Sequence, residues 1–146
     1  MANLQAEEGA APGILYVVAT PIGNLEDITR RAIRILGEVA LIAAEDTRHT
    51  RKLLSSLDIH TSLVSYYKGQ ELSRSRPIIE KLLQGEDVAL VSDAGTPVLN
   101  DPGYELVKAV LEAGYDVSPI PGPSAPLAAL VASGLPSDAF LYLGYL

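Results

Sequence analysis

The sequence predicts an α/β domain with an open, mostly parallel five-stranded sheet and helices on both faces. Two observations carry this prediction. Five short apolar runs alternate along the chain with five segments in which apolar residues recur every three or four positions. The chain has 146 residues, enough for one domain, and no internal repeat interrupts the alternation.

The apolar runs are the predicted strands: Leu15–Ala19, Ala40–Ala44, Leu63–Tyr66, Val88–Val91 and Val117–Ile120. The first, second and fourth are apolar at every position, as expected of strands that are covered on both faces of a parallel sheet. The fifth contains Pro119. Because proline cannot donate a ladder hydrogen bond, this run is predicted to be an edge strand.

The segments between these runs are predicted to be helices, with apolar spacing over Ile28–Val39, Thr50–Leu57, Ile78–Leu83, Leu106–Leu111 and Ser124–Val131. Asp27 is the expected N-cap of the first helix. Pro77 suits the first turn of the third helix, and Asp101-Pro102 suits the start of the fourth.

The composition excludes several classes of site. The sequence has no cysteine and only two histidines, His49 and His60, so we expect no metal site. A net charge of −7 argues against a domain that grips nucleic acid by overall charge. The longest apolar stretch is far shorter than the ~20 residues of a membrane helix, and the first residues lack the apolar core of a signal peptide. We therefore expect a cytoplasmic protein with no membrane partner.

The two ends of the chain differ from its middle. Residues 1–13 are small or acidic and are predicted to be a disordered tail, followed by the α/β domain over residues 14–138. Residues 139–146 are apolar and stop abruptly. We interpret them as the start of a linker to a missing C-terminal domain.

The loops that follow the predicted strands concentrate glycine, proline and acidic residues. Thr20–Asn24, Glu45–Arg48, Ser92–Pro97 and Pro121–Ala125 would all lie at the carboxyl edge of the sheet, where open α/β sheets bind ligands. Tight βα turns favour the same residues, so one such loop is weak evidence and several on one edge are stronger. Neither a dinucleotide fingerprint G-x-G-x-x-G nor a P-loop is present.

These loop motifs resemble the tetrapyrrole methylase superfamily, and within it the branch that acts on ribosomal RNA. The similar segments are Leu15–Ile28, Ala43–Thr50, Leu90–Pro97, Asn100–Gly103, Pro121–Ala125 and Gly134–Asp138. One departure is Tyr66–Glu71, where many members carry a histidine-rich segment.

The resemblance implies S-adenosyl-L-methionine (SAM) as cofactor and transfer of its methyl group to the 2′-hydroxyl of a cytidine in 16S ribosomal RNA of the 30S subunit. It also implies a homodimer with two α/β domains and a cofactor cleft between them, of which this chain would supply half. Carried over by position, the cofactor-binding residues would be Pro21, Ile22, Asp93, Gly95, Thr96, Ser124 and Ala125.

The catalytic hypothesis concerns Glu45, Asp46 and Arg48. A carboxylate of this trio would accept or orient the acceptor hydroxyl, and Arg48 would hold a phosphate. The structural alternative is that Asp46 or Thr47 caps the next helix and Arg48 pairs with Glu45. A modest basic cluster that includes Arg48 either meets RNA or forms a solvated helix face: Arg30, Arg31, Arg34, Arg48, Arg51 and Lys52.

Two other functions remain open. The chain could belong to a methyltransferase for a small molecule of the tetrapyrrole type, since a shared fold does not fix the substrate. It could also be an inactive fragment that folds and dimerises, and the isolated chain is expected to be inactive.

Overall fold

Five parallel strands form the centre of the structure, a computed structural model that describes residues 11–144 and, for Leu72, the backbone alone. The strands are β1 (Leu15–Val18), β2 (Leu41–Ala44), β3 (Leu63–Ser65), β4 (Val88–Val91) and β5 (Val117–Ile120). They lie in the order β3-β2-β4-β1-β5, and every neighbouring pair is parallel. The predicted fold class is confirmed.

Burial along the strands follows their place in the sheet. All four residues of the central strand β4 are buried, because both faces of the sheet are covered there. Strand β5 pairs only with β1 and therefore lies at an edge, as Pro119 predicted.

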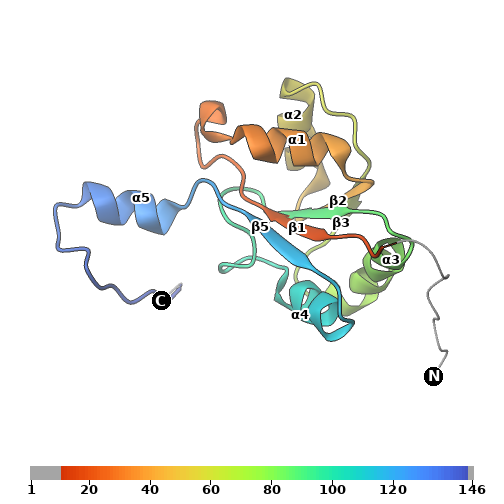
Figure 1. Cartoon of the computed structure of the whole chain (residues 1–146). Helices are drawn as coiled ribbons and strands as arrows, with labels where there is room; N and C mark the ends of the chain where they lie inside the picture. Colours follow the sequence, from red (N-terminus) through yellow and green to blue (C-terminus); the bar gives the residue numbers. More distant parts are fainter. Residues whose placement is uncertain (1–10, 145–146) are drawn as a thin grey trace.

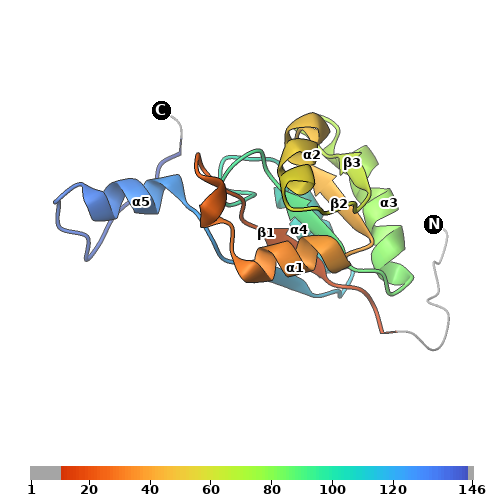
Figure 2. The same cartoon turned by 90° about the horizontal axis from the view of Figure 1, so that it is seen from above.

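Four helices cover the sheet, two on each face (Figure 1). Helices α1 (Arg30–Glu38) and α2 (Thr47–Ser56) lie on one face, and α3 (Glu71–Leu83) and α4 (Tyr104–Glu112) lie on the other, as the view from above also shows (Figure 2). Each pair encloses its own core with the sheet. Leu36 and Leu54 are fully buried in the first core, and Leu82 and Leu106 in the second.

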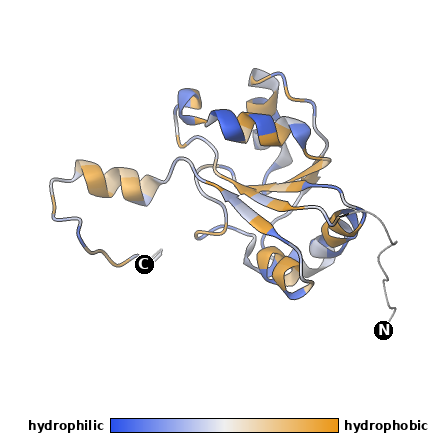
Figure 3. Ribbon diagram, in the orientation of Figure 1, coloured by the Kyte–Doolittle hydropathy of each residue, from blue (hydrophilic) through white to orange (hydrophobic). Residues whose placement is uncertain are grey.

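Helix α5 (Ala125–Ala132) does not cover the sheet. It extends past the carboxyl edge, away from the body of the molecule (Figure 1). The helix is apolar along its length (Figure 3), yet none of its residues is buried. Leu127 is 49% exposed and Val131 is 77% exposed. An apolar helix with this exposure is normally covered in the functional protein.

Three predicted helix starts were wrong. Helix α1 is capped by Thr29, whose hydroxyl accepts a hydrogen bond from the Ala32 amide at 3.0 Å. Asp27 instead ends a short 3-10 helix, η1 (Leu25–Asp27). Pro77 lies inside α3 rather than in its first turn, on the exposed side, where the carbonyl that it leaves unpaired can face solvent.

The third wrong start is that of α4, which begins after Gly103 and not at Asp101-Pro102. Gly103 has φ 137°, and a Cβ there would lie 2.7 Å from Leu90 and 2.9 Å from Val98. Packing against the core therefore fixes this boundary, and the capping signal in the sequence does not.

The loops that follow β1 and β4 leave the sheet toward opposite faces. The connection from β1 runs through α1 to β2 on one side, and the connection from β4 runs through α4 to β5 on the other. The two connections cross, because β2 lies beyond β4 and β5 lies beyond β1. Both begin at the carboxyl edge, which is the usual ligand site of an open α/β sheet.

The outer parts of the chain add two observations. Most of the predicted tail, residues 1–10, lies outside the described residues, whereas Gly13 is buried and donates its amide to the Leu82 carbonyl at 2.8 Å. Within residues 11–144, no helix is long and apolar enough to cross a membrane.

Candidate functional site

The loops after β1 and β4 are joined at the carboxyl edge of the sheet by backbone hydrogen bonds. The Thr20 amide donates to the Gly95 carbonyl at 2.9 Å, and the Gly95 amide donates to the Thr20 carbonyl at 3.0 Å. The Thr20 hydroxyl is buried and reaches the Ser92 carbonyl at 3.4 Å. We call this junction, formed by residues 20–22 and 93–95, the loop wall.

Glycine is required in the loop wall. Gly95 has φ +76°, a conformation that L side chains rarely adopt, and a Cβ there would lie 3.3 Å from the Ile22 side chain. The next residue, Thr96, donates its hydroxyl to the Pro123 carbonyl at 3.1 Å and so ties the loop after β5 to the same junction.

A hollow of about 610 Å³ lies on one side of the loop wall. We call it the α5 hollow, and its lining residues are Ile22, Ala94, Gly95, Thr96, Leu99, Asn100, Asp101, Ser124, Ala125, Pro126, Ala129, Tyr142 and Gly144. The Ser124 side chain precedes α5 without capping it. Tyr142 and Gly144 come from the last described residues, which return toward the body of the molecule (Figure 2).

A smaller groove of about 170 Å³ lies on the other side of the loop wall. We call it the α2 groove, and its lining residues are Thr20, Pro21, Leu25, His49, Lys52, Leu53 and Asp93. One side of this groove is helix α2, and the other is the segment from β1 to η1.

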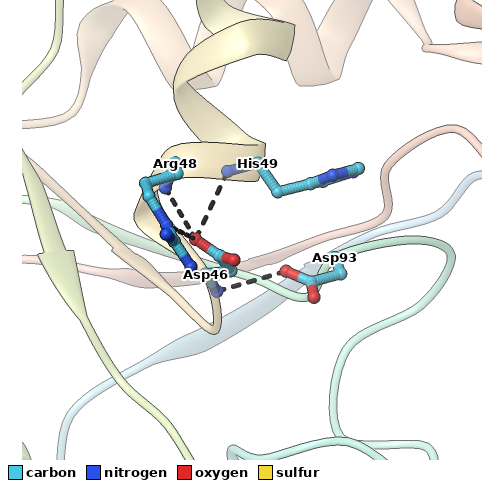
Figure 4. A network of polar contacts seen from close by, with 4 residues as sticks. All are labelled: Asp46, Arg48, His49 and Asp93. Atoms are coloured by element: carbon cyan, nitrogen blue, oxygen red, sulfur yellow. Dashed lines mark hydrogen bonds and ion pairs between the residues drawn. The ribbon is translucent and has the colours of Figure 1, made fainter.

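Asp46 has the capping role that we weighed as the structural alternative. Its carboxylate accepts hydrogen bonds from the amides of Arg48 at 2.8 Å and His49 at 3.4 Å, and these bonds hold its pKa below the usual range. The Arg48 side chain lies 3.6 Å from Asp46, so it pairs with Asp46 and not with Glu45. The Asp46 amide in turn donates to Asp93 at 3.1 Å, as Figure 4 shows.

Three carboxyl groups near this contact, those of Glu45, Asp93 and Asp101, influence one another. Burial raises the pKa of Glu45, and the negative charges of Asp93 and Asp101 raise it further. Burial also raises the pKa of Asp101, against the effect of the nearby Ser92 hydroxyl. Glu45 is therefore a partly buried carboxyl that takes up a proton more readily than an ordinary glutamate.

Five of the seven residues expected to bind the cofactor line the α5 hollow: Ile22, Gly95, Thr96, Ser124 and Ala125. The other two, Pro21 and Asp93, line the α2 groove. The sequence analysis assigned no binding role to His49, although this residue comes directly after the Glu45–Arg48 segment. It grouped Lys52 only with the basic cluster, because no local pattern shows which cations border a groove.

Among the described residues, no group of three histidine, aspartate or glutamate side chains could hold a metal ion.

Known proteins resemble the chain over nearly its whole length. A family model described as tetrapyrrole (corrin/porphyrin) methylases matches residues 14–141. Proteins named ribosomal RNA small subunit methyltransferase I from Micromonospora olivasterospora and Halalkalibacterium halodurans are 55% and 54% identical to it over 97% and 92% of the chain. The protein of that name from Escherichia coli O157:H7 is 54% identical over 92% of the chain.

The chain spans about half the length of these relatives, namely 45%, 46% and 47%. Among solved structures, uroporphyrin-III-C-methyltransferase from Thermus thermophilus superposes with a TM-score of 0.66 at 27% identity. That match covers 85% of this chain and 54% of the other.

Proposed function

Because the chain belongs to the tetrapyrrole (corrin/porphyrin) methylase family, we propose that it forms the cofactor-binding half of a SAM-dependent methyltransferase. Its proposed substrate is the 2′-hydroxyl of a cytidine in 16S ribosomal RNA of the 30S subunit, which the names of its relatives support in part. A reaction on this substrate would take place in the cytoplasm.

The observation that carries the proposal is the convergence of residues from three loops on one hollow. Ile22 follows β1, Gly95 and Thr96 follow β4, and Ser124 and Ala125 follow β5. These positions are far apart in the sequence, and they meet at the carboxyl edge, where open α/β sheets bind ligands.

The hollow also suits the size and chemistry of the cofactor. Its volume of about 610 Å³ falls within the usual ~300–1,000 Å³ of small-molecule pockets. The positive φ of Gly95 brings backbone close to the hollow without a side chain, and the Ser124 hydroxyl precedes the N-terminus of α5, where a carboxylate is favoured. Bound there, SAM would supply an activated methyl group.

The catalytic roles follow from the carboxylates beside the hollow. Glu45 is the better candidate for the base that accepts the proton of the acceptor hydroxyl, because the Asp46 carboxylate already caps α2. Asp46 would position the start of α2 and, through its amide, Asp93. The Arg48 side chain is 90% exposed and would contact a phosphate of the substrate.

The rest of the proposed cleft would come from a second domain that follows this chain. Two facts support this: the chain spans about half of its relatives, and apolar side chains of α5 and of the residues beyond it are exposed. We include a homodimer in the proposal, since a second copy would also cover such a surface.

One observation favours a different substrate. The similar solved structure is a uroporphyrin methyltransferase, so this fold also serves small tetrapyrroles. Tritium transfer from methyl-labelled SAM to purified 30S subunits or to a precorrin, catalysed by the full-length protein, distinguishes the two substrates. Transfer to the precorrin alone would overturn the RNA proposal.

Cofactor binding can be measured on the 146-residue chain itself. Calorimetric titration with SAM, and with S-adenosylhomocysteine in parallel, is expected to give a micromolar dissociation constant. Gly95→Ala would force a strained conformation that costs about 1–2 kcal/mol, so affinity should fall about tenfold or more if the loop shifts to relieve it.

Gly37→Ala is the matched control, because Gly37 lies in α1 with no atom within 4 Å of the added methyl. It should leave affinity unchanged. Absence of binding by the parent chain would show that the α5 hollow alone is not the cofactor site. It would favour the remaining alternative, an inactive fragment.

A further inference from the structure

Only two of the seven residues expected to bind the cofactor, Pro21 and Asp93, line the α2 groove, and the groove carries chemistry of its own. Lys52 and His49 lie one helical turn apart on α2 and both border the groove. Both are exposed, and among residues 11–144 neither has a carboxylate within ion-pair distance. An unpaired lysine at the edge of a groove is available to a ligand.

The charge of the chain is unevenly distributed around this groove. Six of the eleven basic residues lie between positions 30 and 52, with only three of the eighteen acidic residues. All six basic residues belong to α1 or α2, which cover the same face of the sheet (Figure 1). A chain with a net charge of −7 therefore has a locally cationic layer beside the groove, which favours an anionic ligand.

The remaining groove residues limit what that ligand can be. The Asp93 carboxylate also lines the groove and would repel a second phosphate, but it can accept a hydrogen bond from a sugar hydroxyl. Leu25, Leu53 and Pro21 supply an apolar surface for the carbon atoms of a sugar. Two basic side chains, one carboxylate acceptor and several apolar side chains line the same groove, and together they match one ribose with its phosphate.

The groove also has a defined relation to the α5 hollow. Pro21 lines the groove and Ile22 lines the hollow; likewise Asp93 lines the groove and Ala94 the hollow. The loop wall alone separates them, and Thr20 and Gly95 fix its position. A ligand in the groove would therefore lie next to a cofactor in the hollow.

We propose that the α2 groove binds one ribose-phosphate unit of the RNA strand that carries the methyl acceptor. Lys52 and His49 contact the phosphate, and Asp93 contacts a ribose hydroxyl. His49 can donate from its ring in either protonation state. This inference rests on the proposed function, because it takes RNA as the substrate.

Fluorescence anisotropy with a labelled 12-nucleotide single-stranded RNA tests the proposal on the 146-residue chain. The dissociation constant is measured from about 50 to 200 mM salt, where each neutralised phosphate of a single strand contributes about 0.7 to the log–log slope. Lys52→Gln is expected to weaken binding and to lower the slope by about 0.7. His49→Ala is expected to weaken binding as well.

Lys108→Gln is the matched control, since Lys108 is an exposed lysine of α4 on the opposite face of the sheet. Equal binding by the Lys52→Gln and Lys108→Gln variants, or no binding by the parent, would overturn the proposal. A DNA strand of the same sequence should bind more weakly, because it lacks the 2′-hydroxyl. Equal affinity for DNA would overturn the role of Asp93.

Calorimetry with SAM on the same variants separates this proposal from the previous one. Lys52→Gln should bind the cofactor like the parent chain. If the parent chain does not bind SAM, the proposed cofactor site is wrong. If the parent binds SAM and Lys52→Gln leaves RNA binding unchanged, only the proposed role of the groove is wrong.

Discussion

The structural and chemical roles of Asp46 can be separated by comparing its alanine and asparagine variants. Asp46→Ala removes both hydrogen bonds that the side chain accepts at the start of α2, and loss of such a cap costs about 0.5–2 kcal/mol. Asp46→Asn keeps an oxygen acceptor in the same place. We expect urea denaturation to show a lower free energy of unfolding for the alanine variant and little change for the asparagine variant.

Methylation by the full-length protein completes this comparison. If Asp46 only positions α2, the asparagine variant should retain most of the activity. A stable asparagine variant without activity would show instead that the carboxylate itself takes part in the chemistry.

Glu45 gives a prediction about pH. Its pKa is raised in the folded chain by burial and by neighbouring carboxylates, so the folded state holds this proton more tightly than the unfolded state does. The free energy of unfolding therefore falls as pH rises from the unfolded pKa, about 4.3, through the raised folded pKa. Glu45→Gln removes this cost, so the variant should be more stable than the parent at neutral pH.

The advantage of Glu45→Gln should disappear when the pH is lowered below the unfolded pKa, where the parent carboxyl is protonated in both states. Urea denaturation of both proteins at several pH values measures it. Glu26→Gln removes one charge from an exposed position outside the carboxylate group and is the control. A gain that is the same at every pH would contradict the explanation.

At the scale of elements, α5 is an apolar helix in which no residue is buried. Replacing Leu127 and Val131 by lysine removes two exposed apolar side chains from it. We expect sedimentation velocity to show weaker, less concentration-dependent self-association for this double variant. Its free energy of unfolding should change little, because no residue of α5 is buried.

Leu111→Lys is the matched control for that experiment, since Leu111 is an exposed leucine of α4, on the body of the molecule. If the parent is monomeric at all concentrations, or if both variants associate equally, α5 does not mediate self-association.

The elements and the bounds of the strands were largely predictable, whereas three helix starts were not. Runs such as Val88–Val91 are apolar at every position because β4 is covered on both faces. The sequence pattern therefore predicts the burial of this strand. The start of α4 depends instead on the space that Leu90 and Val98 leave beside Gly103. That constraint is non-local, and capping signals in the sequence cannot report it.

At the scale of the whole molecule, the sequence predicted which edge carries the candidate site but not how that edge is divided. Parallel strands place all their following loops at one edge, so the loop motifs were sufficient for the first conclusion. The division into a groove and a hollow depends on the pairing of Thr20 with Gly95, 75 positions apart in the numbering. No local pattern encodes that pairing.

The loop wall has a thermodynamic consequence, because it is a surface shared by two cavities. Its two backbone hydrogen bonds make residues 20–22 and 93–95 move together, so the cavities cannot change shape independently. A ligand that displaces the wall from one side alters the free energy of binding on the other side. By linkage such an effect is reciprocal and equal in both directions, so a ligand in either cavity would change the affinity of the other by the same factor.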